Sequence, residues 1–163
     1  MINKLKSEFE NFYNASSNFM FVDGYSGIGK SLFAKQICED INRINGDISA
    51  VLTNVSSRGS GKEFITSLIR RMDENLLRNS TLFELKSHLL TLLSQHKLLV
   101  IDGSQNLLIS NRSLVNHFIL LSWIVEQTNI KVLYLGAIPL QLYLESLYIV
   151  DINRRSVHYS LIA

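Results

Sequence analysis

The chain has 163 residues, of which 47% are hydrophobic and 18% charged, and its formal net charge is +2. This length and composition predict one folded domain with a sizeable core, and they exclude a disordered chain. No apolar run is long enough to cross a membrane, and no apolar signal core follows the first lysines, so a cytoplasmic protein without a membrane partner is expected.

The first predicted element is a helix over residues 3–13, because apolar side chains recur there at helical spacing. This helix and the polar segment that follows it at 14–17 make up an N-terminal helix and linker, residues 1–17. Residues 18–163 are then expected to form the core domain. That core begins with a short apolar run at 18–23, which predicts a buried strand.

Residues 24 to 31 have the sequence Gly-Tyr-Ser-Gly-Ile-Gly-Lys-Ser and match the phosphate-binding pattern G-x-x-x-x-G-K-[ST] at every fixed position. In this pattern the glycines let backbone N–H groups point at an anion, Lys30 reaches the β- and γ-phosphates, and Ser31 places its hydroxyl on Mg²⁺. A helix predicted over 30–43 adds the free N–H groups of its first turn. We therefore expect ATP or ADP and Mg²⁺ to bind here. The expected contacts are Gly24, Tyr25, Ser26, Gly27, Ile28, Gly29, Lys30, Ser31 and Leu32.

The next elements are a second strand over 48–55 and two helices over 62–77 and 80–95. Ser80 is the expected N-cap of the second of these helices, with Glu84 in its first turn.

Metal and disulfide chemistry is not indicated elsewhere. The single cysteine, Cys38, cannot form an internal disulfide and is expected to fill apolar space. His88, His96, His117 and His158 have no spacing that indicates a metal site, and they are expected at the surface or in packing.

Residues 97–102 are an apolar run that ends in Asp102, which predicts a central buried strand. Ligands collect at the carboxyl ends of such strands, and a carboxylate there holds Mg²⁺ in P-loop ATPases. Asp102 is therefore expected to be the second metal-binding residue beside Ser31. The alternative is an ordinary strand-end or helix-capping aspartate.

A polar loop is expected after Asp102, followed by a helix over 112–128, a strand over 130–135, a short helix over 138–147 with Pro139 in its first turn, and a last strand over 156–162. Strands that alternate with helices predict an α/β fold. Together with the glycine loop, this pattern predicts a P-loop NTPase three-layer sandwich with a mainly parallel five-stranded sheet. One strand should lie between the strand before the glycine loop and the strand that ends at Asp102.

Four stretches carry a resemblance to AAA+ ATPases, and within them to the TniB/TnsC/MuB group that assists DNA transposition. They are the glycine loop at 24–31, Leu-Leu-Val-Ile-Asp-Gly-Ser-Gln-Asn-Leu at 98–107, Val-Leu-Tyr-Leu-Gly-Ala at 132–137 and Asp-Ile-Asn-Arg-Arg at 151–155. The resemblance covers most of the chain from about residue 15. It implies that residues 18–163 form a P-loop ATPase core of AAA+/ASCE type. It also implies catalytic roles for Lys30 and Asp102, and an ATP-dependent homo-oligomer.

The resemblance also implies an arginine finger, Arg154 or Arg155, that reaches the nucleotide of a neighbouring subunit. The alternative is a solvated basic pair. In the resembled group the region after the second strand faces duplex DNA, so Arg58 and Lys62 are expected to contact DNA phosphates. The alternative here is a solvated helix face with acidic residues interspersed. A transposase or a replication protein is the implied protein partner.

Two departures from the family pattern concern hydrolysis. The catalytic glutamate of the family corresponds to Gly103, and the polar residue after the fourth strand corresponds to Ala137. Gln105 could orient a water molecule, but it is displaced by two residues from the position of the family's glutamate. The alternative is that Gln105 is a polar loop residue.

AAA+ proteins also carry a helical lid after the last core strand. The sequence ends at Ala163, so the lid is expected to be lacking, in a minimal variant or in a piece of a larger protein.

The leading hypothesis is therefore an ATP-binding, DNA-associated helper in transposition or replication with weak hydrolysis. One alternative is a non-catalytic nucleotide-dependent interaction module, which the glycine at 103 favours. The other is a small-molecule P-loop kinase, for which Arg112 is the candidate substrate-binding arginine.

Overall fold

The computed structural model describes residues 2–46, 49–55, 61–73, 80–147, 152 and 154–161. Its centre is a five-stranded sheet in the order β2-β3-β4-β1-β5, with every neighbouring pair parallel. The strands are β1 (Phe19–Asp23), β2 (Ala50–Asn54), β3 (Leu98–Asp102), β4 (Lys131–Gly136) and β5 (Ser156–Ser160). As predicted, one strand, β4, lies between β1 and β3.

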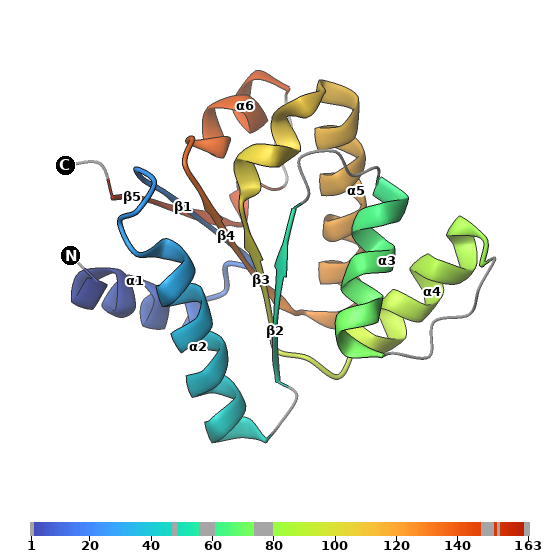
Figure 1. Cartoon of the computed structure of the whole chain (residues 1–163), viewed down its shortest axis with the longest axis horizontal. Helices are drawn as coiled ribbons and strands as arrows, with labels where there is room; N and C mark the ends of the chain where they lie inside the picture. Colours follow the sequence, from blue (N-terminus) through green and yellow to red (C-terminus); the bar gives the residue numbers. More distant parts are fainter. Residues whose placement is uncertain are drawn as a thin grey trace.

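Helices cover both faces of this sheet, which confirms the predicted three-layer α/β sandwich (Figure 1). The helices are α1 (Ile2–Asn14), α2 (Lys30–Asn45), α3 (Gly61–Met72), α4 (Leu82–Leu93), the 3-10 helix η1 (Ser104–Ile109), α5 (Asn111–Thr128) and α6 (Leu140–Ser146). In Figure 1, α1 and α2 lie on one side of the sheet and α3, α4 and α5 on the other. No helix among the described residues combines the length and the apolar character that a membrane span requires.

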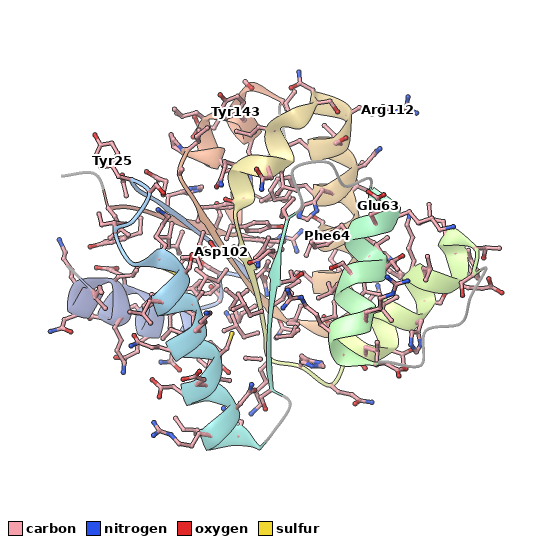
Figure 2. All side chains as sticks on the ribbon, in the orientation of Figure 1. Tyr25, Glu63, Phe64, Asp102, Arg112 and Tyr143 are labelled. Carbon is pink, nitrogen blue, oxygen red and sulfur yellow. The ribbon has the colours of Figure 1, made fainter. Side chains whose placement is uncertain are left out.

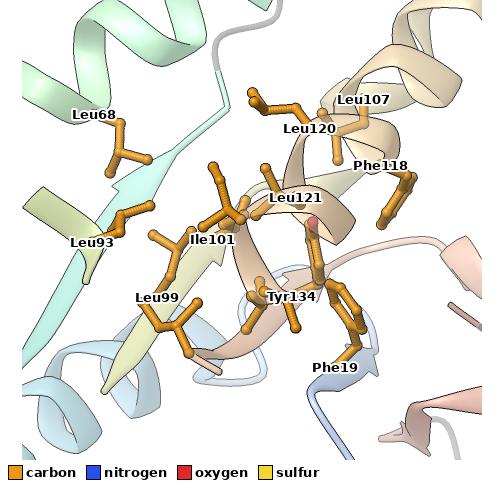
Figure 3. Packing of buried hydrophobic residues seen from close by; sticks show 14 of the residues in the cluster. Phe19, Leu68, Leu93, Leu99, Ile101, Leu107, Phe118, Leu120, Leu121 and Tyr134 are labelled. Carbon is orange, nitrogen blue, oxygen red and sulfur yellow. The ribbon is translucent and has the colours of Figure 1, made fainter. Parts of the chain in front are cut away.

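Two apolar cores follow from this layering, because successive side chains of a strand point to opposite faces. Phe19 and Phe21 of β1 belong to the core under α3, α4 and α5, whereas Met20 and Val22 belong to the core under α1 and α2. Figure 3 shows the first core, in which Tyr134 of β4 packs beside Phe118 of α5. Burial on both faces explains why the central strands are continuous apolar runs.

His117 of α5 is a buried polar residue that packs against Phe118 and Tyr134 of the first core. Its Nε2 and the hydroxyl oxygen of Tyr134 are 2.9 Å apart, and both residues are buried. Burial lowers the pKa of His117 from 6.5 to about 3, so this imidazole is neutral in the folded chain. The prediction that the histidines lie at the surface or in packing is confirmed for this residue. Cys38, which was predicted to fill apolar space, is buried as well.

Three local predictions were wrong. The segment after Asp102 is the helix η1 rather than a loop, and Pro139 is the N-cap of α6 rather than a residue of its first turn. The N-cap of α4 is Thr81, not Ser80. The threonine hydroxyl accepts the N–H of Glu84 at 3.2 Å, and the Glu84 carboxylate accepts the N–H of Thr81 at 2.6 Å. This reciprocal capping box requires the polar residue three positions before the glutamate, which is Thr81.

Replacing Thr81 by alanine should therefore lower the free energy of unfolding by about 1 kcal/mol, because one N–H of the first turn of α4 loses its acceptor. The measurement is urea denaturation followed by circular dichroism. Ser87→Ala is the matched control, since Ser87 is exposed in the middle of the same helix. An equal effect of the two substitutions would contradict the assigned cap.

Candidate nucleotide-binding site

The glycine loop connects the carboxyl end of β1 to the first turn of α2. Gly27 and Gly29 have φ angles of 81° and 100°, in the left-handed region that favours glycine. Gly29 is also the N-cap of α2, and no side chain caps the helix there. The N–H groups of the first turn of α2 therefore remain available to an anion at this point.

Gly24 fits the same loop for a different reason, which is close packing. A Cβ atom at this position would lie 2.8 Å from Cβ of Leu161, just after β5. The N–H of Gly24 donates to the carbonyl oxygen of Gly136 at 3.2 Å, which joins the loop to the end of β4. The glycine thus lets the loop start directly from the edge of the sheet.

The ammonium group of Lys30 lies over the loop itself. Its Nζ donates to the carbonyl oxygens of Gly24 at 2.6 Å and Tyr25 at 2.7 Å. Burial lowers the pKa of Lys30, and the nearby charges of Asp102 and Asp23 oppose that shift. An ammonium group has three donors, so two bonds to the loop leave one N–H for a ligand.

Asp102 is the last residue of β3, so it lies at the carboxyl ends of the strands, as the glycine loop does. Its Oδ1 accepts the N–H of Gly103 at 2.9 Å. The glycine loop and the Asp102 segment together enclose one cavity of about 270 Å³. Its lining residues are Ser26, Gly27, Gly29, Lys30, Ser31, Leu32, Asp102, Gly103, Gln105, Gly136 and Ala137. The structure thus brings together the two motifs that the sequence predicts.

The oxygen atoms at this cavity suit Mg²⁺. Ser31 and Asp102 both line it, and they carry hydroxyl and carboxylate oxygens of the kind that Mg²⁺ prefers as ligands. No group of three or more His, Cys, Asp or Glu side chains among the described residues could hold a metal ion. A magnesium ion at Ser31 and Asp102 would accordingly need phosphate and water oxygens to complete its coordination.

Of the other predicted loop contacts, Leu32 lines the cavity, whereas Gly24, Tyr25 and Ile28 are not among its lining residues. Tyr25 contributes its carbonyl oxygen to Lys30 and is 66% exposed. Figure 2 shows its side chain pointing outward from the loop, at the outer edge of the molecule.

The segment after Asp102 reaches across the site to the end of β4. Gly103 has a φ of 74° and is the N-cap of η1. The side-chain oxygen of Gln105 accepts the N–H of Ala137 at 3.1 Å. Gln105, Gly136 and Ala137 form the wall of the cavity opposite the glycine loop. The sequence did not indicate this contact, and the only local clue was a Gly-Ala pair at the end of a strand.

Arg154 and Arg155 lie away from this cavity. They precede β5, at the amino ends of the strands, because Ser156 pairs with Phe19 at the start of β1. The glycine loop lies at the opposite, carboxyl ends of the strands. The guanidinium group of Arg155 contacts the carboxylate of Glu126 at 3.1 Å, and Arg154 is exposed. Neither arginine can reach the nucleotide site of its own chain, so any such contact would be with a neighbouring subunit.

The basic surface predicted to face DNA is separate as well. Arg58 lies outside the described residues. Lys62, near the start of α3, lines a surface groove, together with Glu63, Thr66, Ser67, Arg70 and Arg71. The guanidinium group of Arg71 donates to the carbonyl oxygen of Leu52 at 3.0 Å and so covers the edge of β2. Arg112, the candidate for a kinase, is exposed at the start of α5 and does not line the nucleotide cavity (Figure 2).

Comparisons with known proteins agree with this architecture. The family described as "AAA domain" matches residues 14–144. Among curated proteins, none matches the sequence.

Solved structures are similar in fold. The ORC2 protein of Aeropyrum pernix in ADPNP and ADP complexes has a TM-score of 0.63 at 16% identity, over 98% of this chain and 45% of that chain. DnaA from Aquifex aeolicus bound to AMPPCP has a TM-score of 0.61 at 14% identity, over 97% and 46%. Drosophila ORC bound to AT-rich DNA and Cdc6 has a TM-score of 0.62 at 13% identity, over 98% and 27%. The chain thus spans less than half the length of these structures.

Proposed function

Because the chain belongs to the AAA domain family, we propose that its cavity binds ATP with Mg²⁺ and that the bound nucleotide controls assembly, with weak turnover. One observation carries the proposal. Left-handed glycines, an uncapped helix N-terminus, a buried lysine and a strand-end aspartate line one cavity. Each of these groups favours a phosphate or its metal ion.

The residues act as follows in this proposal. The N–H groups at the start of α2 hold the phosphate oxygens, and Lys30 turns an N–H toward the β- and γ-phosphates. Ser31 and Asp102 hold Mg²⁺, which neutralises phosphate charge when bound. The loop carbonyls that Lys30 contacts keep its ammonium group within reach of the cavity.

Weak turnover follows from the residues after Asp102. Hydrolysis needs a side chain that orients the attacking water, and Gly103 has none. The residue after β4 is Ala137, which likewise offers no side-chain polar group to the terminal phosphate. Binding groups are thus retained where hydrolytic groups are not.

The DNA-associated role rests on resemblance and on surface charge. The similar DnaA and ORC structures include complexes with DNA. In this chain, the groove with Lys62 and two arginines could contact DNA phosphates without sequence preference. Arg154 or Arg155 would act on the nucleotide of an adjacent subunit in such an assembly. We therefore propose a transposition or replication helper, and the non-catalytic interaction module remains the alternative because of Gly103.

Three measurements on the wild-type chain test this function. Calorimetry with ATP and ADP in Mg²⁺ should show binding of both. Light scattering should show growth of the particle with ATP and duplex DNA together, and steady-state phosphate release should be slow. ATP binding without any effect of DNA would favour the interaction module. Hydrolysis as fast as in active AAA+ enzymes would refute weak turnover, and no nucleotide binding would refute the whole proposal.

A further inference from the structure

The side chain of Gln105 lies between the two positions at which the site lacks an expected side chain. Its oxygen accepts the N–H of Ala137 at 3.1 Å. Its nitrogen lies on the side of Gly103, 4.0 Å from where a Cβ atom of that residue would stand. A single amide therefore connects the position of the missing catalytic glutamate with the position of the missing polar residue after β4.

The orientation of this amide is determined by its partner. The backbone N–H of Ala137 can only donate, so the end of the Gln105 side chain that faces it must be the oxygen. The NH₂ group is then the other end, on a residue that lines the nucleotide cavity. Within the described part of the chain, this NH₂ group has no hydrogen-bond acceptor. Two N–H donors are thus available at the cavity.

The backbone that carries Gln105 is held on both sides. On one side, glycine at 136 makes room, because a Cβ atom there would lie 2.3 Å from Oγ of Ser104 and 3.3 Å from the Gln105 side-chain oxygen. On the other side, the Asn106 side chain donates to the carbonyl oxygen of Val55 at 2.8 Å. The amide is therefore placed before any ligand arrives, which reduces the cost of ordering it on binding.

We propose that Gln105 is the residue that distinguishes ATP from ADP, by donating an N–H to the terminal phosphate or to a water molecule against it. This inference rests on the proposed binding of ATP in the same cavity. The free end of the amide is a donor only, so it cannot accept a proton from the attacking water. Gln105 would therefore make assembly depend on the γ-phosphate without acting as a base in its hydrolysis.

The test compares ATP, a non-hydrolysable ATP analogue and ADP by calorimetry at constant Mg²⁺. Gln105→Leu removes both polar ends of the side chain. We expect it to weaken the binding of ATP and its analogue about tenfold or more, the loss typical of a hydrogen bond to a charged group, and to leave ADP affinity within about twofold. Gln95→Leu is the matched control, because Gln95 is exposed and precedes β3, at the end of the strand opposite the nucleotide cavity.

A second variant keeps the test decisive if Gln105→Leu disturbs η1. Gln105→Glu can still accept the N–H of Ala137, but it places a carboxylate where the NH₂ group stands. It should weaken ATP more than ADP through repulsion of the γ-phosphate. If both variants kept the wild-type ratio of ATP to ADP affinity, whether or not both affinities fell together, the inference about Gln105 would be overturned. The proposal that the cavity binds ATP would then still stand. A wild-type chain that binds neither nucleotide would instead overturn the proposed function.

Discussion

Lys30→Ala is expected to lower the affinity for ATP and for ADP by at least about a hundredfold. The ammonium group makes charge-assisted hydrogen bonds to phosphate oxygens, and each such bond contributes about 1.5–3 kcal/mol. The partly desolvated position of Lys30 strengthens these contacts, since burial already lowers its pKa. Isothermal calorimetry with Mg²⁺ measures the change directly.

Two further variants make this result specific. Lys35→Ala removes an exposed lysine from the same helix and should leave the affinity unchanged. Lys30→Met retains the length of the side chain but loses the two bonds to the loop carbonyls, so it separates packing from charge. If either Lys30 variant bound ATP as tightly as the wild type, the assignment of the loop would be wrong.

The glycine loop could be predicted from the sequence because its chemistry is local. Eight consecutive residues contain the turn, the lysine and the start of α2, and the flanking apolar periods are clear. A strand inserted between β1 and β3 was likewise predicted, but the sequence did not identify it as β4. The strand that the interval between the two motifs contains is β2, and it lies at the edge of the sheet. The central parallel strands were predictable from their long apolar runs, because these strands are buried on both faces of the sheet.

The opposite wall of the cavity could not be predicted, because it depends on a contact between residues 32 positions apart, Gln105 and Ala137. A short 3-10 helix also gives little periodic pattern, so η1 was interpreted as a loop. Glycine at 136 looked like a strand-end residue, and only the structure shows that Ser104 occupies the space of a side chain there.

Gly103 illustrates the limit of residue-by-residue comparison. The sequence shows a missing carboxyl group, whereas the structure adds that the backbone itself has a left-handed φ of 74°. A glutamate placed there would be strained by about 1–2 kcal/mol. The backbone at this position therefore disfavours a glutamate side chain, and the nucleotide chemistry of the site should be judged from the whole η1 segment.

Acid is expected to destabilise the fold through His117. The pKa of His117 is about 3 in the folded chain and 6.5 in a solvated imidazole, so the unfolded chain binds more protons between these values. The free energy of unfolding should thus be highest above pH 6.5 and fall by about 1.4 kcal/mol per pH unit as the pH decreases toward 3. Urea denaturation between pH 7.5 and pH 4.5, about three units apart, would measure this slope.

The paired substitution of His117 and Tyr134 distinguishes this explanation from a general effect of acid. His117→Phe alone removes the titrating group but leaves the buried Tyr134 hydroxyl without its partner, which costs about 1–3 kcal/mol at neutral pH. His117→Phe with Tyr134→Phe removes both polar groups, so it should recover most of that loss and retain the shallower acid slope. If the double variant lost stability in acid as steeply as the wild type, the buried imidazole would not be its cause, and the carboxylates would have to account for it.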